Sequence, residues 1–200
     1  ASEWEKIEEQ IRAHPDNFNV SGYFEGKFAS VLPFEKIAAG FWNNLGLIKE
    51  VQAEQNNDPR EKKALYREAY HCLEKSLRIN PNYASAHYNL GLFYARRERV
   101  LAMGLPYPES LKEAVGYFQR AIELNPRDAG AHNNLGALYA RREFASSEEE
   151  YLGNFKIAFR EMYQAFQLRR TPEQLDRFLL VITKIPSDHS RDVFGLLDEE

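Results

Sequence analysis

The stretch AHYNLGLFYARRE at residues 86–98 recurs as AHNNLGALYARRE at residues 131–143. The two copies lie 45 positions apart and share 10 of their 13 residues, and a further NLG at residues 44–46 precedes them by another 45. Self-similarity with a period of about 20–50 residues is the signature of stacked structural repeats. We therefore expect three related units rather than one unrepeated core.

Each unit contains a second recurring segment, which predicts a pair of helices. The copies of this segment cover residues 68–81, 113–126 and, more loosely, 157–172. In the NLG segment, the spacing of His87, Leu90, Gly91 and Tyr94 places them on one face of a helix. The first two copies of the second segment end in proline, which is typical of a helix stop.

Turn and cap signals set the expected helix bounds. Ser147 and Glu150 have the spacing of a capping box, and TPEQ at residues 171–174 predicts a further helix that ends near Ile185. Turn-forming residues gather at 56–60, 103–108 and 144–147. The paired helices are therefore expected at 33–55, 59–79, 83–102, 109–124, 128–144 and 147–169.

This pattern predicts an all-α solenoid of antiparallel helix pairs, because each pair leaves an apolar face that only the next pair can cover. We expect capping elements at both ends, as in other solenoids. The N-terminal segment, rich in aromatic residues, either packs on the first unit or occupies the groove. The expected divisions are a cap at 1–34, units at 35–81, 82–126 and 127–170, and a capping helix with a tail at 171–200.

The recurring residues resemble the tetratricopeptide repeat family, whose pattern is W-x2-L-G-x2-Y, then A-x3-F-x2-A, then P. The matching residues are Trp42, Leu45, Gly46, Ala69, Leu73, Ser76, Pro81, Leu90, Gly91, Tyr94, Ala114, Phe118, Ala121, Pro126, Leu135, Gly136, Tyr139, Ala158, Met162 and Ala165. The family period is about 34 residues, whereas this chain repeats every 45. We expect the extra residues to form longer helices and a longer turn. His87 and His132 stand where the family has Trp, and we expect them to pack in the core.

The resemblance implies that the first helix of each pair lines a concave surface that binds a protein partner. A rotation of about 100° per residue places Asn44, Asn89 and Asn134 at one point of that surface, opposite the core stripe. They resemble the asparagine ladder of some superhelical family members. A carboxamide both donates and accepts, so it can pair with any peptide backbone. Alternatively, the three residues are relics of duplication or hydrogen-bond within their own helices.

Further side chains are predicted to join the asparagines in this groove. Leucines would add apolar contacts, and arginines would favour an acidic residue or a free carboxylate. The predicted groove consists of Asn44, Asn89, Asn134, Leu47, Leu92, Tyr88, Asn133, Arg96 and Arg141. The predicted partner is an extended peptide or a helix of another protein. The alternative is a self-assembling subunit that forms a homo-oligomer through its repeat ends or C-terminal helix.

Other chemistries find little support. No phosphate-binding loop, H-E-x-x-H or G-x-S-x-G motif occurs, and Cys72 and His71 point about 100° apart on a helix. We therefore expect no catalytic residue, metal or cofactor. A net charge of −4 argues against a general nucleic-acid binder, and no stretch has the length of a membrane-spanning helix. The single cysteine suits a cytoplasmic protein, or a periplasmic or secreted one if a signal peptide was removed.

Overall fold

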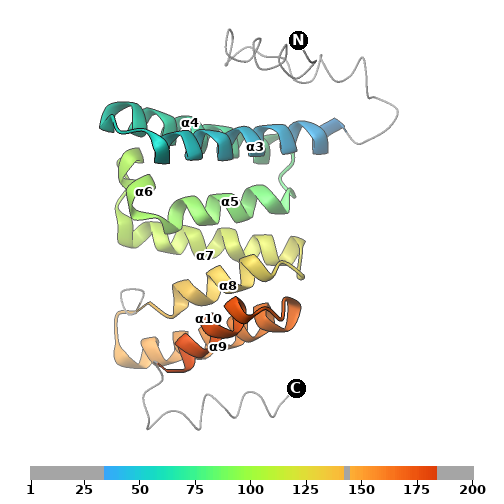
Figure 1. The fold of residues 1–200 in the computed structure, drawn as a ribbon, viewed down its shortest axis with the longest axis vertical. Coiled ribbons are helices and arrows are strands. Elements are labelled where there is room, and N and C mark those ends of the chain that lie inside the picture. Colours follow the sequence, from blue (N-terminus) through green and yellow to red (C-terminus); the bar gives the residue numbers. More distant parts are fainter. Residues whose placement is uncertain (1–33, 142–144, 184–200) are drawn as a thin grey trace.

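A computed structural model describes residues 34–141 and 145–183, and this part of the chain forms a stack of helices (Figure 1). Its eight α-helices are α3 (Phe34–Gln55), α4 (Pro59–Ile79), α5 (Ala84–Ala95), α6 (Arg97–Met103), α7 (Tyr107–Leu124), α8 (Ala129–Tyr139), α9 (Glu148–Leu168) and α10 (Pro172–Ile182). The predicted caps at 1–33 and the tail from 184 lie outside the described residues. No helix in the described part is both long and apolar enough to cross a membrane.

The helices pack as three successive pairs, which confirms the predicted all-α solenoid. Helix α3 packs most extensively against α4, α5 against α7 and α8 against α9, while α10 covers α9. Figure 1 shows the pairs following one another along the long axis of the molecule. The largest apolar cluster extends over α4, α5, α6, α7 and α8, so the core runs through the junctions between units.

The glycine of each NLG motif lets the two helices of its pair approach closely. A Cβ atom added at Gly91 would lie 2.7 Å from the Phe118 ring, and one at Gly136 would lie 2.9 Å from the backbone oxygen of Ala158. A side chain at Gly91 would displace the Phe118 ring, and one at Gly136 would also displace the backbone of α9. Close approach at this point explains why glycine recurs despite its poor helix propensity.

The extra residues of the second unit do not lengthen its first helix, so the prediction of one helix over 83–102 is wrong. Arg96 adopts an extended backbone conformation (φ −102°, ψ 112°) that ends α5, and a separate short helix, α6, follows. The new direction buries Val100 completely and packs α6 against α4. The free energy gained by burying this apolar side chain exceeds that gained by continuing α5, which the local sequence permits. Gly104, with φ 77°, ends α6 in the left-handed conformation.

A buried ion-pair group ties α6 to the first unit. Arg99 is only 6% exposed and donates from Nη1 to Glu50 Oε2 at 2.6 Å and from Nη2 to Glu54 Oε1 at 2.8 Å. Two carboxylates thus share one guanidinium. Burial raises the pKa of Glu50 to about 7, against the opposing charge of Arg99.

The starts of α9 and α10 follow the sequence signals closely. Ser147 Oγ accepts from Glu150 N at 3.1 Å, and the Glu150 carboxylate accepts from Ser146 N at 2.6 Å, which confirms a capping arrangement before α9. Thr171 caps α10 by accepting from Gln174 N at 3.3 Å. Helix α8 ends at Tyr139, short of the predicted 144, and α10 ends at Ile182.

Candidate functional site

The recurring asparagines join consecutive first helices. Asn89 Nδ2 donates to Asn43 Oδ1 at 2.8 Å, and Asn134 Nδ2 donates to Tyr88 Oη at 3.1 Å. Each bond connects a residue of one unit to the residue 46 positions earlier. We call this pair of hydrogen bonds the inter-repeat seam. Its function in the fold is to hold α3, α5 and α8 in a fixed register.

The prediction that Asn89 points away from the core is wrong, because its side chain is only 7% exposed. Helix α5 contacts α3, α4, α7 and α8, so neighbours cover a wider arc than its own partner helix alone. Asn44 does remain exposed, although it accepts from Asn43 Nδ2 at 3.1 Å. The predicted Asn ladder is therefore partly a structural element of the stack.

The other predicted groove residues differ in how far they are accessible. Leu47 is half-buried, and Leu92 is half-buried against the main core cluster. Tyr88 is also half-buried, because it packs on the Phe118 ring at a centroid distance of 5.9 Å. Arg96 is exposed at the break between α5 and α6.

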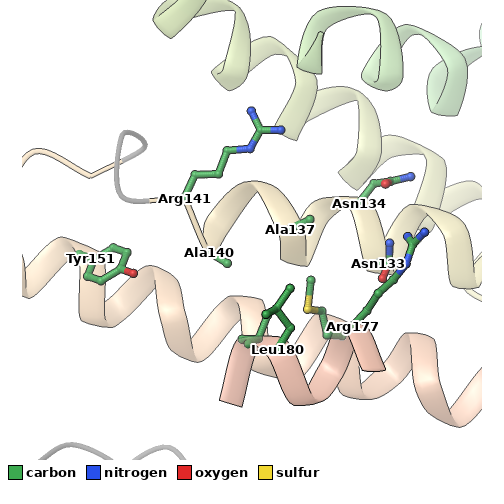
Figure 2. A pocket seen from close by; sticks show the side chains of 10 residues that line it. Asn133, Asn134, Ala137, Ala140, Arg141, Tyr151, Arg177 and Leu180 are labelled. Atoms are coloured by element: carbon green, nitrogen blue, oxygen red, sulfur yellow. The ribbon is translucent and has the colours of Figure 1, made fainter. Parts of the chain in front are cut away.

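A pocket of about 1040 Å³ opens between α8, α9 and α10 (Figure 2). Three predicted groove residues line it: Asn133, Asn134 and Arg141. The remaining lining residues are Ala137, Ala140, Tyr151, Met162, Arg177, Leu180 and Val181. The six other predicted groove residues (Asn44, Asn89, Leu47, Leu92, Tyr88 and Arg96) do not line this pocket. Three of the nine predicted groove residues thus come together at a pocket of the third unit.

Two arginines give the pocket a positive electrostatic character. Figure 2 shows Arg141 and Arg177 toward opposite ends, and no described residue that lines the pocket is acidic. Arg141 Nη1 donates to Tyr107 Oη at 2.7 Å, which holds the guanidinium near α7 at this end of the pocket. Arg177 pairs with Glu173 one turn earlier at 2.7 Å, but both side chains are exposed, and such pairs are weak.

Asn133 supplies a buried polar group to the pocket wall. Its side chain is 4% exposed, and Oδ1 has no hydrogen-bond partner among the described residues. An unpaired buried acceptor is unfavourable by about 1–3 kcal/mol. Apolar atoms of Met162, Leu180 and Val181 complete the surface opposite, and Leu180 is 58% exposed. The pocket therefore combines amides, cations and apolar contacts.

His132, beside Asn133 on α8, is buried in the core as predicted, and it also forms an ion pair there that the sequence analysis did not predict. Its Nδ1 lies 2.7 Å from Glu161 Oε2, and its Nε2 lies 3.1 Å from the Pro126 carbonyl oxygen. Both partners are acceptors, so the ring satisfies both only as an imidazolium. The hydrogen bond to Glu161 raises the pKa of His132 despite burial. Burial alone would raise the pKa of Glu161, but His132 and Arg160 outweigh it and lower that pKa.

His87 makes the equivalent bond one unit earlier, with Nε2 at 2.8 Å from the Pro81 carbonyl oxygen. Both histidines therefore fasten the turn that precedes their helix. Tyr117 occupies the place of Glu161 in the second unit, just as Phe118 occupies that of Met162, and its ring lies 6.0 Å from the His87 ring. Tyr117 offers no carboxylate, so His87 has no equivalent ion pair there. Within the described residues, no group of three or more His, Cys, Asp or Glu side chains is arranged to hold a metal.

Sequence reasoning missed the contribution of α10 to the pocket. The helix was expected only to cover the last unit, yet it supplies Arg177, Leu180 and Val181. The repeat register contained the missing signal, because Arg177 follows His132 by 45 residues. Helix α10 thus occupies the place of a first helix in a fourth unit.

Comparisons with known proteins agree with this architecture. A family model described as a TPR repeat matches residues 109–142, and one described as a tetratricopeptide repeat matches residues 72–102. No curated protein matches the chain.

Proposed function

Because this chain is a protein of tetratricopeptide repeats, we propose that it is a scaffold that binds an extended segment of a partner protein across its third repeat. Such repeats generally serve protein–protein interaction rather than catalysis. The pocket between α8, α9 and α10 is the observation that carries the proposal, because three predicted groove residues line it.

The dimensions and chemistry of the pocket suit a short extended peptide. Its volume of about 1040 Å³ lies at the upper end of ordinary ligand pockets, which span about 300–1,000 Å³. Carboxamides on one wall can pair with main-chain groups, which every peptide offers. Apolar side chains on α9 and α10 can contact an apolar residue of the partner.

Charge favours a partner segment that contains acidic residues. Arg141 and Arg177 line the pocket without a described acidic residue among the lining side chains, although the chain as a whole has a net charge of −4. A guanidinium binds a carboxylate through two parallel hydrogen bonds, which adds specificity to attraction. The exposed Asn44 and Arg96 stay predicted contacts for a longer segment that continues along the first helices.

A selection from a phage-displayed library of random 12-residue peptides on the immobilised chain tests the proposal. We expect enriched peptides to contain Asp or Glu and to bind the double variant Arg141→Ala/Arg177→Ala at least about 10-fold more weakly. The double variant Arg67→Ala/Arg78→Ala makes the same charge change at exposed positions of α4 and serves as the matched control. Absence of any enriched peptide, or equal losses in both double variants, would refute the proposed function.

One observation favours self-assembly as a second candidate function. Leu175 and Leu179 on α10 are 39% and 46% exposed, one turn apart on the same helix. A second copy that covered them would give a molecular mass that rises with concentration. Sedimentation velocity over a range of concentrations tests this, and Leu179→Glu should abolish any such rise. A constant monomer mass would exclude it.

A further inference from the structure

The two acceptors of the inter-repeat seam have a counterpart one unit further along the chain that lacks a donor. The acceptors Asn43 and Tyr88 lie 45 residues apart, and another 45 residues lead to Asn133. The first two acceptors receive a hydrogen bond from the asparagine of the following unit. At the third, the residue in register with those asparagines is Leu179, whose side chain has no donor.

The third acceptor is unpaired, and it belongs to a residue that lines the pocket. Asn133 Oδ1 has no partner among the described residues, its side chain is 4% exposed, and Asn133 lines the pocket between α8 and α10. Within residues 34–141 and 145–183, four other buried side chains contain an unpaired polar atom (Trp42, Glu50, His87 and Asn154), and none of them lines this pocket. Among the described residues, Asn133 is therefore the pocket-lining residue that has a buried, unpaired polar atom.

We propose that the partner segment completes the seam: one of its main-chain N–H groups donates to Asn133 Oδ1 while an acidic side chain of the same segment binds Arg177. This inference rests on the proposed function and specifies what the pocket recognises. The acceptor requires a donor from the occupant. Lysine or arginine side chains are disfavoured as that donor, because Arg141 and Arg177 already line the pocket. A neutral main-chain N–H meets the requirement at every residue except proline.

Arg177 lies where the acidic side chain of such a segment would reach it. Figure 2 shows its side chain at the end of the pocket that holds Asn133 and Asn134, away from Arg141. Glu173, its present partner on α10, is 72% exposed, so water screens that pair. The guanidinium can therefore exchange Glu173 for a partner carboxylate in the less exposed pocket.

Backbone methylation of a bound peptide tests the inference directly. The probe is a fluorescein-labelled copy of the most enriched acidic peptide from the 12-residue library, titrated against the full chain by fluorescence anisotropy. A set of variants of this peptide has one main-chain N–H replaced by N–CH₃ at each position in turn. We expect one position at which methylation weakens binding about 10-fold, because a single hydrogen bond is lost.

A protein variant assigns that position to Asn133. Asn133→Leu keeps a similar shape without the acceptor, so the unmethylated peptide should bind it about 10-fold more weakly, and methylation at the sensitive position should then have little further effect. Asn133→Asp keeps acceptor oxygens and should retain sensitivity to methylation. Circular dichroism of each variant verifies that the helices are intact.

The possible outcomes separate this inference from the proposed function. Suppose that peptide binding depends on Arg141 and Arg177. If no position is then sensitive to methylation, or if Asn133→Leu shows the same sensitivity as the native chain, the inference is overturned and the proposed function stands. Absence of any acidic peptide that binds would overturn both. If Asn133→Leu does not fold, the methylation scan on the native chain still decides, because insensitivity at every position excludes a main-chain donor.

Discussion

Replacement of an NLG glycine by alanine tests how closely the paired helices approach. At Gly136 an added Cβ would lie 2.7 Å from Met162 Cγ and 2.9 Å from the backbone oxygen of Ala158. At Gly116, inside α7, nothing lies within 4 Å of the same atom. Both glycines lie within helices, so Gly116→Ala is a matched control in which only the packing differs.

The expected changes in the free energy of unfolding have opposite signs. Alanine is better than glycine in a helix interior by about 1 kcal/mol, and both variants gain this. Overpacking of a filled core destabilises by about 1–3 kcal/mol. The destabilisation from overpacking in Gly136→Ala should lie near the upper limit of this range, because the Ala158 carbonyl is backbone and cannot rotate away. We expect a net loss of about 2 kcal/mol for Gly136→Ala and a gain of up to about 1 kcal/mol for Gly116→Ala.

The free energy of unfolding of Gly91→Ala should lie between those of these two variants. The nearest neighbours of a Cβ added at Gly91 are ring atoms of Phe118 at 2.7 Å, and a side chain can tilt where a carbonyl cannot. Thermal unfolding followed by circular dichroism measures all three variants. About 2–4 °C per kcal/mol applies at this chain length, so Gly136→Ala and Gly116→Ala should differ by about 6–12 °C in Tm. Equal stability of these two variants would refute the close approach of α8 and α9.

Three further predictions concern titration and capping. The raised pKa of Glu50, about 7 against 4.5, means that the folded chain binds a proton more tightly, so stability should fall by at most about 3 kcal/mol as pH rises from 4.5 to 7. Urea unfolding at several pH values should show a flatter profile for Glu50→Gln, and an unchanged profile would contradict the burial effect. The stabilisation from His132, whose pKa is raised, is complete below pH 6.5 and lost above it, whereas that from Glu161 is lost below pH 4.5. The variant His132→Asn should therefore lack the decline in stability above pH 6.5. If that decline persists in the variant, another group causes it. Thr171→Ala should destabilise α10 by about 1 kcal/mol, measured as faster amide hydrogen exchange in that helix than in α8.

The helix pairs could be predicted because their signals are local and repeated. The period, the prolines after the second helices and the caps at Ser147 and Thr171 each concern neighbouring residues, and the observed bounds agree within a few residues. The end of α5 at Arg96 could not be predicted in this way. Neither glycine nor proline marks it, and the break is stabilised by burial of Val100 and Arg99 against distant helices.

The candidate site was only partly predictable for the same reason. Asn134 and Arg141, which helical rotation assigns to the predicted groove, line the pocket. Helical rotation misplaced Asn89, because the buried arc of α5 depends on two adjacent units as well as on its own partner helix. To predict that Arg177 lines the pocket, one must also know that α10 continues the register of the first helices.

Because of the ion pairs of Arg99, the joints between successive units should differ in their resistance to bending. These ion pairs fasten the first unit to the second, where Arg99 reaches Glu50 and Glu54. Forty-five residues later the same three positions hold Phe144, Ala95 and Arg99, which cannot form such a group. Bending and twisting of the solenoid should therefore concentrate at the joint between the second and third units. The hydrogen bond from Arg141 to Tyr107 crosses that joint, so a change of curvature there would shift a guanidinium that lines the pocket.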